Sequence, residues 1–144
     1  MRMWGEIWPL LLVIASNTTY HLISNRTPAA VNPFLSLVVT YLVGAATAFA
    51  LYLATAGGAG LVHSLSRLNW TSAALGLAIV GLESGFLYLY RAGWGISVAS
   101  LTANLAVAVL LLVIGVLCYH EGLRAHQLLG AALCVAGLIL VNWK

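Results

Sequence analysis

The stretch ISVASLTANLAVAVLLLVIGVLCY, residues 96–119, decides the fold because it contains no charged side chain. A helix needs about 20 consecutive apolar residues to cross the hydrocarbon core of a bilayer, and this stretch is that long. Four more apolar stretches flank it: three precede it, at about residues 7–24, 32–55 and 71–90, and one follows it, at about residues 126–143. The sequence therefore predicts an all-α integral membrane protein with five transmembrane helices in one domain, residues 1–144.

The composition supports a membrane class. The chain is 62% hydrophobic and 6% charged, and its mean hydropathy is +1.02. A soluble domain has about 25% charged residues, so the bilayer is the expected solvent. The net charge of +3 is dispersed over single residues and forms no nucleic-acid-binding patch. The two cysteines, Cys118 and Cys134, are interpreted as packing residues in apolar helices.

The segments between the apolar stretches are short and leave no room for a soluble domain. Residues 61–70 are too polar to span, so we expect them at the membrane interface with Trp70 as an anchor. Arg2 followed by an apolar run is also typical of a signal peptide. Glu6 interrupts that pattern and no clear cleavage site follows, so the first helix is expected to be retained.

The basic residues are divided evenly between the two predicted membrane faces. With five spans, one face carries Arg2, Arg67 and Arg124, and the other carries Arg26, Arg91 and Lys144. Orientation normally follows the face with more Lys and Arg, and here the two faces have three each. The even division predicts a protein that inserts in both orientations.

Polar residues inside predicted spans follow single helical faces. They lie at helical spacing in three of the spans: Asn17, Tyr20, His21 and Ser24; Asn32, Ser36, Thr40 and Thr47, with the small residue Gly44 on the same face; Ser97, Ser100 and Asn104. Lipid-facing positions should be apolar, so these faces are expected to contact protein or water. The alternative is hydrogen bonding between helices, worth about 0.6–2 kcal/mol per group.

Glu83 is the leading candidate for a functional residue. It lies near the middle of the 71–90 span, where an acidic residue costs about 2.5–3.5 kcal/mol on insertion scales. A carboxyl group that is neutral in one environment and ionised in another can exchange a proton for a cationic substrate. Phe86 and Tyr90 follow at i+3 and i+7, where aromatic faces attract an organic cation. The predicted substrate and proton site comprises Glu83, Asn17, Tyr20, His21, Asn104, Phe86 and Tyr90.

Structural interpretations of the same residues stay open. Glu83 could be a neutral hydrogen-bonding group whose partner is His21 or Asn104, and the two aromatic rings could be ordinary packing residues. Small residues predict close helix contacts, within the chain or between chains, at Gly81, Gly85, Gly130 and Gly137. His120, Glu121 and His126 lie close together, but their spacing defines no coordination geometry. No metal site, cofactor or catalytic pair is predicted, and an enzyme is not expected.

The stretch 119–123, Tyr-His-Glu-Gly-Leu, followed by residues 126–141, resembles the EamA-like half of the drug/metabolite transporter superfamily. The matching positions are Glu121, Gly130, Leu133 and Gly137. The fourth span lacks the Pro often found there in that family, with Asn104 in its neighbourhood, and Glu83 is not a general family feature. The resemblance implies half of an inverted-repeat transporter, with a substrate cavity between two halves.

An odd number of spans places the two termini of one chain on opposite membrane faces. Two chains inserted oppositely could then pair about a two-fold axis in the membrane plane and reproduce an inverted repeat. We therefore predict an antiparallel, dual-topology homodimer that transports small organic metabolites or cations by alternating access, coupled to protons through Glu83, in a prokaryotic inner membrane. The alternatives are an uncoupled facilitator, a non-transporting accessory subunit, and a heterodimer with a paralogous half.

Overall fold

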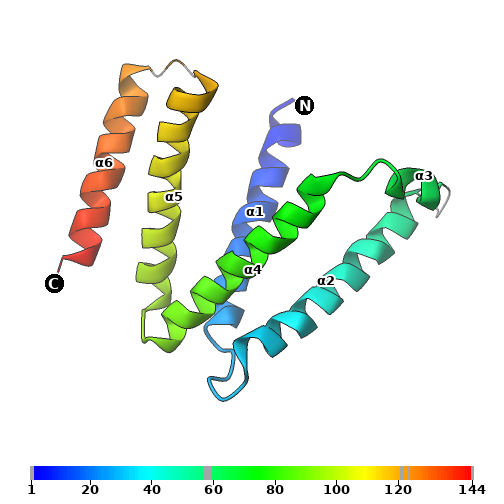
Figure 1. Cartoon of the computed structure of the whole chain (residues 1–144). Coiled ribbons are helices and arrows are strands. Elements are labelled where there is room, and N and C mark those ends of the chain that lie inside the picture. Colours follow the sequence, from blue (N-terminus) through cyan, green and yellow to red (C-terminus); the bar gives the residue numbers. More distant parts are fainter. Residues whose placement is uncertain (1, 57–59, 121, 123, 144) are drawn as a thin grey trace. The chain divides into compact units, whose positions relative to one another are not determined.

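All regular secondary structure in the described part of the chain is α-helical. The computed structural model describes residues 2–56, 60–120, 122 and 124–143, without the side chains of residues 2–6 and 62. Its helices are α1 (Arg2–Ser24), α2 (Pro33–Ala56), α3 (Leu61–Leu65), α4 (Trp70–Arg91), α5 (Ile96–Tyr119) and α6 (Ala125–Asn142). Figure 1 shows them in chain order. The all-α class expected from the sequence is confirmed.

Helix ends follow local chemistry. α2 begins at Pro33, whose missing N–H suits a first helical turn, and the Asn32 Oδ1 accepts a hydrogen bond from the Phe34 N–H at 2.9 Å. α5 ends at Tyr119, and its C-cap residue His120 adopts the left-handed conformation with φ 54°. α6 starts where the Arg124 N–H donates to the Gln127 side chain at 2.8 Å. The segment expected at the interface contains the five-residue helix α3.

Four of these helices are long and apolar enough to cross a membrane: α2, α4, α5 and α6, with hydropathies of 2.0, 1.6, 2.6 and 1.7. Large apolar side chains such as Leu77 and Leu117 are exposed on them, 77% and 69%, as expected for surfaces that lipid covers. These are features of an integral membrane protein. α1 is not among the four, because the polar residues of its second half, from Asn17 to His21, lower its hydropathy.

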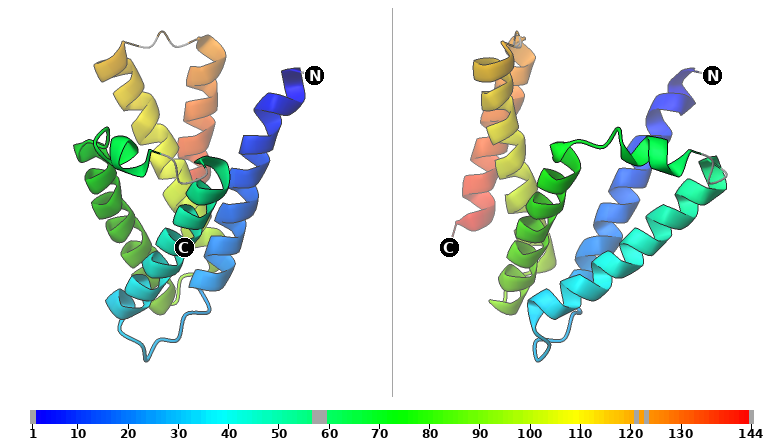
Figure 2. Two further views of the ribbon diagram at one scale, coloured as in Figure 1. Left: turned by 90° about the vertical axis from the view of Figure 1, so that its right-hand side faces the viewer. Right: turned by 45° about the vertical axis from the view of Figure 1, so that its right-hand side comes forward.

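The chain forms two compact units. The first contains residues 23–91, in which α2 packs against α4. Figure 2 shows that the beginning of α2 lies beside the end of α4. The Arg91 Nη2 holds this end by donating to the carbonyl oxygens of Pro28, at 3.3 Å, and Val31, at 2.7 Å. Among the buried apolar side chains in this unit are Leu37 and Leu87.

The second unit contains residues 1–22 and 92–144. Within it α5 and α6 form an antiparallel helical hairpin, visible in Figures 1 and 2. At the open end of the hairpin, opposite the connection between the two helices, the Asn142 Nδ2 donates a hydrogen bond to the Thr102 Oγ1 at 3.0 Å and links α6 to α5. On α1, the rings of Tyr20 and His21 meet edge to face with centroids 5.1 Å apart, and His21 is buried.

Candidate functional site

The candidate site in the 23–91 unit is centred on the carboxyl group of Glu83. α4 holds this residue half-buried within an apolar span, and the Tyr41 hydroxyl of α2 faces it. The two groups lie close enough to interact, but no hydrogen bond of normal geometry joins them in the described part of the chain. The Tyr41 oxygen is buried and meets no partner of normal hydrogen-bond geometry in the described part of the chain. The pair can therefore tighten into a hydrogen bond or accept a third group.

The same side of α4 continues from Glu83 into aromatic and polar surroundings. Phe86 and Tyr90 are both buried, and their rings stack with centroids 6.0 Å apart at an interplanar angle of 25°. Tyr90 also lines a pocket of about 200 Å³ with Arg91 and residues of the α1–α2 connection. In this pocket the Ser24 Oγ and the Arg91 Nε are buried without a hydrogen-bond partner among the described residues.

The other predicted site residues belong to the second unit. Asn17 on α1 and Asn104 on α5 are exposed, Tyr20 is half-buried, and His21 is buried. An amide side chain exposed on a hydrophobic helix requires protein or water opposite it in a bilayer. Asn17 and Asn104 therefore mark the surfaces of α1 and α5 that should not face lipid.

Several hydroxyl groups of the predicted polar faces are used within their own helices. Thr40 donates to the Ser36 carbonyl at 3.1 Å, Thr47 to that of Val43 at 2.8 Å, and Ser100 to that of Ile96 at 2.7 Å. Such i−4 bonds satisfy the hydroxyl hydrogen without a neighbouring helix. These residues can still accept a hydrogen bond, but they are weaker site candidates than Glu83.

The small-residue positions have free space beside them. A Cβ atom added at Gly81, Gly85, Gly130 or Gly137 would meet no atom within 4 Å in the part of the chain that the structure describes. A hollow of about 260 Å³ between α5 and α6 is lined in part by Gly130 and Cys134. The contacts that the small residues predict at these glycines are therefore not made within the described part of the chain.

Of the three residues His120, Glu121 and His126, Glu121 lies outside the described residues. His120 and His126 are exposed, one as the C-cap of α5 and the other in the first turn of α6.

Tyr41 is the site residue that sequence reasoning missed. It lies next to Thr40 but outside the predicted polar face of residues 32–47, and its spacing of four from Leu37 is typical of a packing residue. The sequence indicates only an orientation signal at Arg91, whereas its guanidinium group also donates to two backbone carbonyl oxygens. The signal in the sequence is a tyrosine inside one predicted span while another span contains an intramembrane acid, since a hydroxyl group is a suitable hydrogen-bond partner for that acid.

Fold and site together define a class: a helical integral membrane protein with a carboxyl–hydroxyl pair inside an apolar helix pair. No family model matches the chain, and no match is found among curated proteins or solved structures.

Proposed function

We propose that this protein is half of a small transporter, and that two copies inserted in opposite orientations move organic cations or small metabolites across the membrane by alternating access. The observation that carries the proposal is the pair formed by Glu83 and Tyr41 within α4 and α2. An ionisable residue inside a membrane-spanning helix is costly and is typical of ion and substrate pathways. The resemblance to the EamA-like half supports the same class.

A second copy is proposed because one chain leaves polar groups where lipid would otherwise lie. Glu83 is only half-buried, and Asn17 and Asn104 are exposed. An oppositely oriented copy could cover these groups and enclose a shared cavity near the midplane, as in transporters built from inverted repeats. The even division of basic residues, three on each predicted face, allows both orientations.

The proposal requires α1 to be the fifth span. With 23 residues it is long enough to cross a bilayer, and its hydropathy is lowered by polar residues in its second half. Those residues are tolerated at membrane depth if they line the shared cavity rather than the lipid. A prokaryotic inner membrane is the proposed location.

The proposed mechanism exchanges a proton for a cation at Glu83. With the cavity open to one side, the protonated carboxyl group releases its proton to water, and the carboxylate binds the substrate cation. The Tyr41 hydroxyl donates a hydrogen bond to the carboxylate, and the stacked rings of Phe86 and Tyr90 offer aromatic faces to the substrate. After the cavity opens to the other side, a proton binds Glu83 and the cation leaves.

The decisive test measures uptake of a fluorescent organic cation, ethidium, into proteoliposomes under an imposed pH gradient. Glu83→Gln keeps the size of the side chain and removes the titratable proton, so gradient-driven uptake should fall to the level of empty liposomes. Glu6→Gln is the control, because position 6 precedes the apolar stretch 7–24 in the sequence, and the substitution should leave uptake unchanged. Gradient-driven uptake that persists in Glu83→Gln would remove Glu83 from the mechanism.

An uncoupled facilitator is the second candidate, favoured by the Tyr41 hydroxyl next to Glu83. If the carboxyl group stays protonated and hydrogen-bonded to that hydroxyl during the whole transport cycle, Glu83 only stabilises the structure. A facilitator would equilibrate ethidium without a pH gradient, and Glu83→Gln would retain that activity.

A further inference from the structure

We propose a binding site for a primary ammonium group at the open end of the α5–α6 hairpin. The structure has a pocket of about 400 Å³ there, within the usual range for small-molecule sites. It is lined by Ala92, Gly93, Trp94, Gly95, Val98, Val141, Asn142 and Trp143. All of these residues belong to the second unit, and the site is independent of the proposed transport function.

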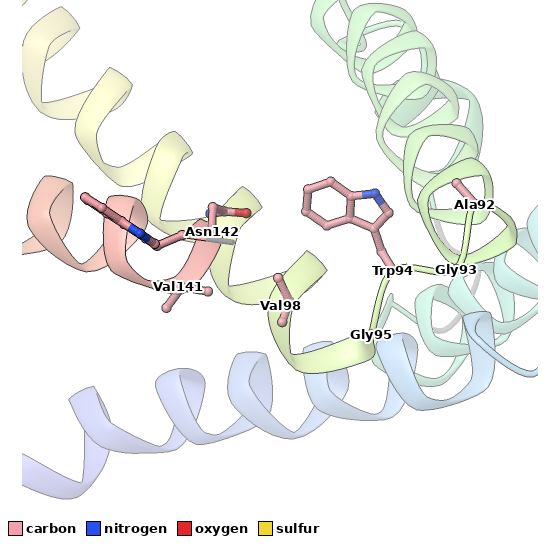
Figure 3. A pocket seen from close by; sticks show the side chains of 8 residues that line it. Ala92, Gly93, Trp94, Gly95, Val98, Val141 and Asn142 are labelled. Carbon is pink, nitrogen blue, oxygen red and sulfur yellow. The ribbon is translucent and has the colours of Figure 1, made fainter.

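The amide group of Asn142 has a defined orientation in this pocket. Its Nδ2 donates to the Thr102 Oγ1 at 3.0 Å and to the Leu138 carbonyl oxygen at 2.9 Å. Both amide hydrogens are thereby used. Figure 3 shows the Asn142 oxygen pointing toward the Trp94 side chain. The pocket therefore presents a hydrogen-bond acceptor held in place by two bonds on the other side of the amide.

Two tryptophans complete the recognition. Trp94 is 39% exposed, whereas Trp143 and Trp70 are 76% and 77% exposed. Trp94 therefore forms part of the wall, and Trp143 lies nearer the rim. The indole ring is the best aromatic partner for a cation, worth about 0.5–2 kcal/mol depending on desolvation. An ammonium group could donate one N–H to Asn142 while its charge lies against an indole face.

The lining also disfavours anions. None of the eight described residues that line the pocket carries a charge, so it offers an anion no basic side chain. The N-terminus of α5 and the C-terminus of α6 lie at the same end of the hairpin, and their opposite partial charges largely offset each other. Selection therefore depends on the Asn142 oxygen and the indoles, and both favour an ammonium ion.

An ammonium group could come from a soluble amine or from the headgroup of phosphatidylethanolamine. The test uses the full chain labelled with 5-fluorotryptophan in detergent, with each ¹⁹F resonance assigned by a Trp→Phe variant. Butylammonium chloride should shift the Trp94 and Trp143 resonances saturably, while the Trp70 resonance stays unchanged. Butanol, which has the same alkyl chain without the charge, should have no comparable effect. Equal responses to butanol, or an equal response at Trp70, would overturn the proposal.

Two variants test the recognition. Trp94→Leu and Asn142→Leu should each weaken butylammonium binding about fivefold or more, with the Trp143 resonance as the reporter. Trp94→Phe keeps an aromatic face and should lie between Trp94→Leu and the unsubstituted protein, which separates recognition from misfolding. Unchanged affinity in Trp94→Leu would also refute the site.

Nanodiscs then separate the two sources. If the lipid headgroup is the occupant, adding phosphatidylethanolamine to phosphatidylglycerol nanodiscs shifts both resonances and reduces the response to butylammonium. If the occupant is a soluble amine, the butylammonium response is the same in both lipid compositions.

Discussion

Glu83 depends on its neighbours for any function beyond packing, and Tyr41 is the neighbour that the structure supplies. The tyrosine hydroxyl can donate to a carboxylate, and it also competes with a substrate for that carboxylate. A charged hydrogen bond contributes about 1.5–3 kcal/mol when well formed, and the Tyr41 hydroxyl does not yet make one of normal geometry with Glu83. In the proposed mechanism, this one contact therefore decides between proton exchange at Glu83 and a structural hydrogen bond.

Tyr41→Phe should reduce gradient-driven ethidium uptake by up to about tenfold, the factor that corresponds to ~1.4 kcal/mol. The ring is preserved, so only the hydroxyl contact with Glu83 is lost. Tyr52→Phe is the matched control, because Tyr52 lies on the same helix and its hydroxyl is likewise buried without a partner among the described residues. Equal losses in both variants would show that the effect is structural.

Arg91→Lys should lower the free energy of unfolding of the purified protein by about 1–2 kcal/mol, and with it the melting temperature. The lysine keeps the charge, and with it the orientation signal, but its shorter side chain does not carry a donor to the position of the Arg91 Nη2, which donates to both carbonyl oxygens. Thermal unfolding in detergent is the measurement. Arg67→Lys, at an exposed position, should have no effect. An unchanged melting temperature for Arg91→Lys would mean that the two hydrogen bonds add no net stability.

At the scale of elements, most residues of the described helices are exposed. α6 contains no buried residue among those described, and its strongest neighbour is α5. The free space beside Gly81 and Gly85 lies on α4, next to Glu83. In a membrane, small residues with open space beside them suit close approach by another helix. α4 is therefore the element expected to contact the second copy.

Gly85→Leu should weaken dimerisation without destabilising the single chain, because the new side chain enters open space. Gly76→Leu is the control: Gly76 also has open space beside it on α4, but five residues from Gly81 it points to a different side of the helix. Crosslinking yield in membranes measures the dimer. The proposed contact at α4 is wrong if the two variants behave alike.

At the scale of the whole molecule, the proposed transport function depends on how the chain inserts into the membrane. Three basic residues on each predicted face leave the orientation balanced. A single added charge should therefore bias insertion. Because the proposed transporter needs both orientations, a biased chain should be inactive alone and active with a chain biased the other way.

Ala30→Lys and Leu68→Lys test this relation, since the two exposed positions lie in connections on opposite predicted faces. A C-terminal tag on the unsubstituted chain should be accessible from both sides of the membrane. Each variant should show the tag on one side only, the two on opposite sides, and transport should return when they are expressed together. Activity of either variant alone, with its tag on one side, would exclude the antiparallel dimer.

Much of the fold could be predicted because the residues of a short segment are enough to show whether it forms an apolar helix and where that helix begins and ends. The charge-free run at 96–119 becomes α5 with the same bounds, and Asn32–Pro33 marks the start of α2. α1 shows the limit of that approach. Its polar second half makes it a candidate for lining a cavity, and the same residues keep it out of the set of clear spanning helices. Hydropathy alone cannot separate a cavity-lining helix from one that does not span.

The helical membrane class and the approximate helix ends follow from the sequence alone, and Glu83 is already a candidate there, because each depends on the solvation of a short segment. Only the tertiary structure decided which distant groups meet: Tyr41 with Glu83, Arg91 with the α1–α2 connection, and Asn142 with Thr102. These contacts depend on how helices pack along their length. That packing is set by the combined fit of many side chains, which no local pattern in the chain records.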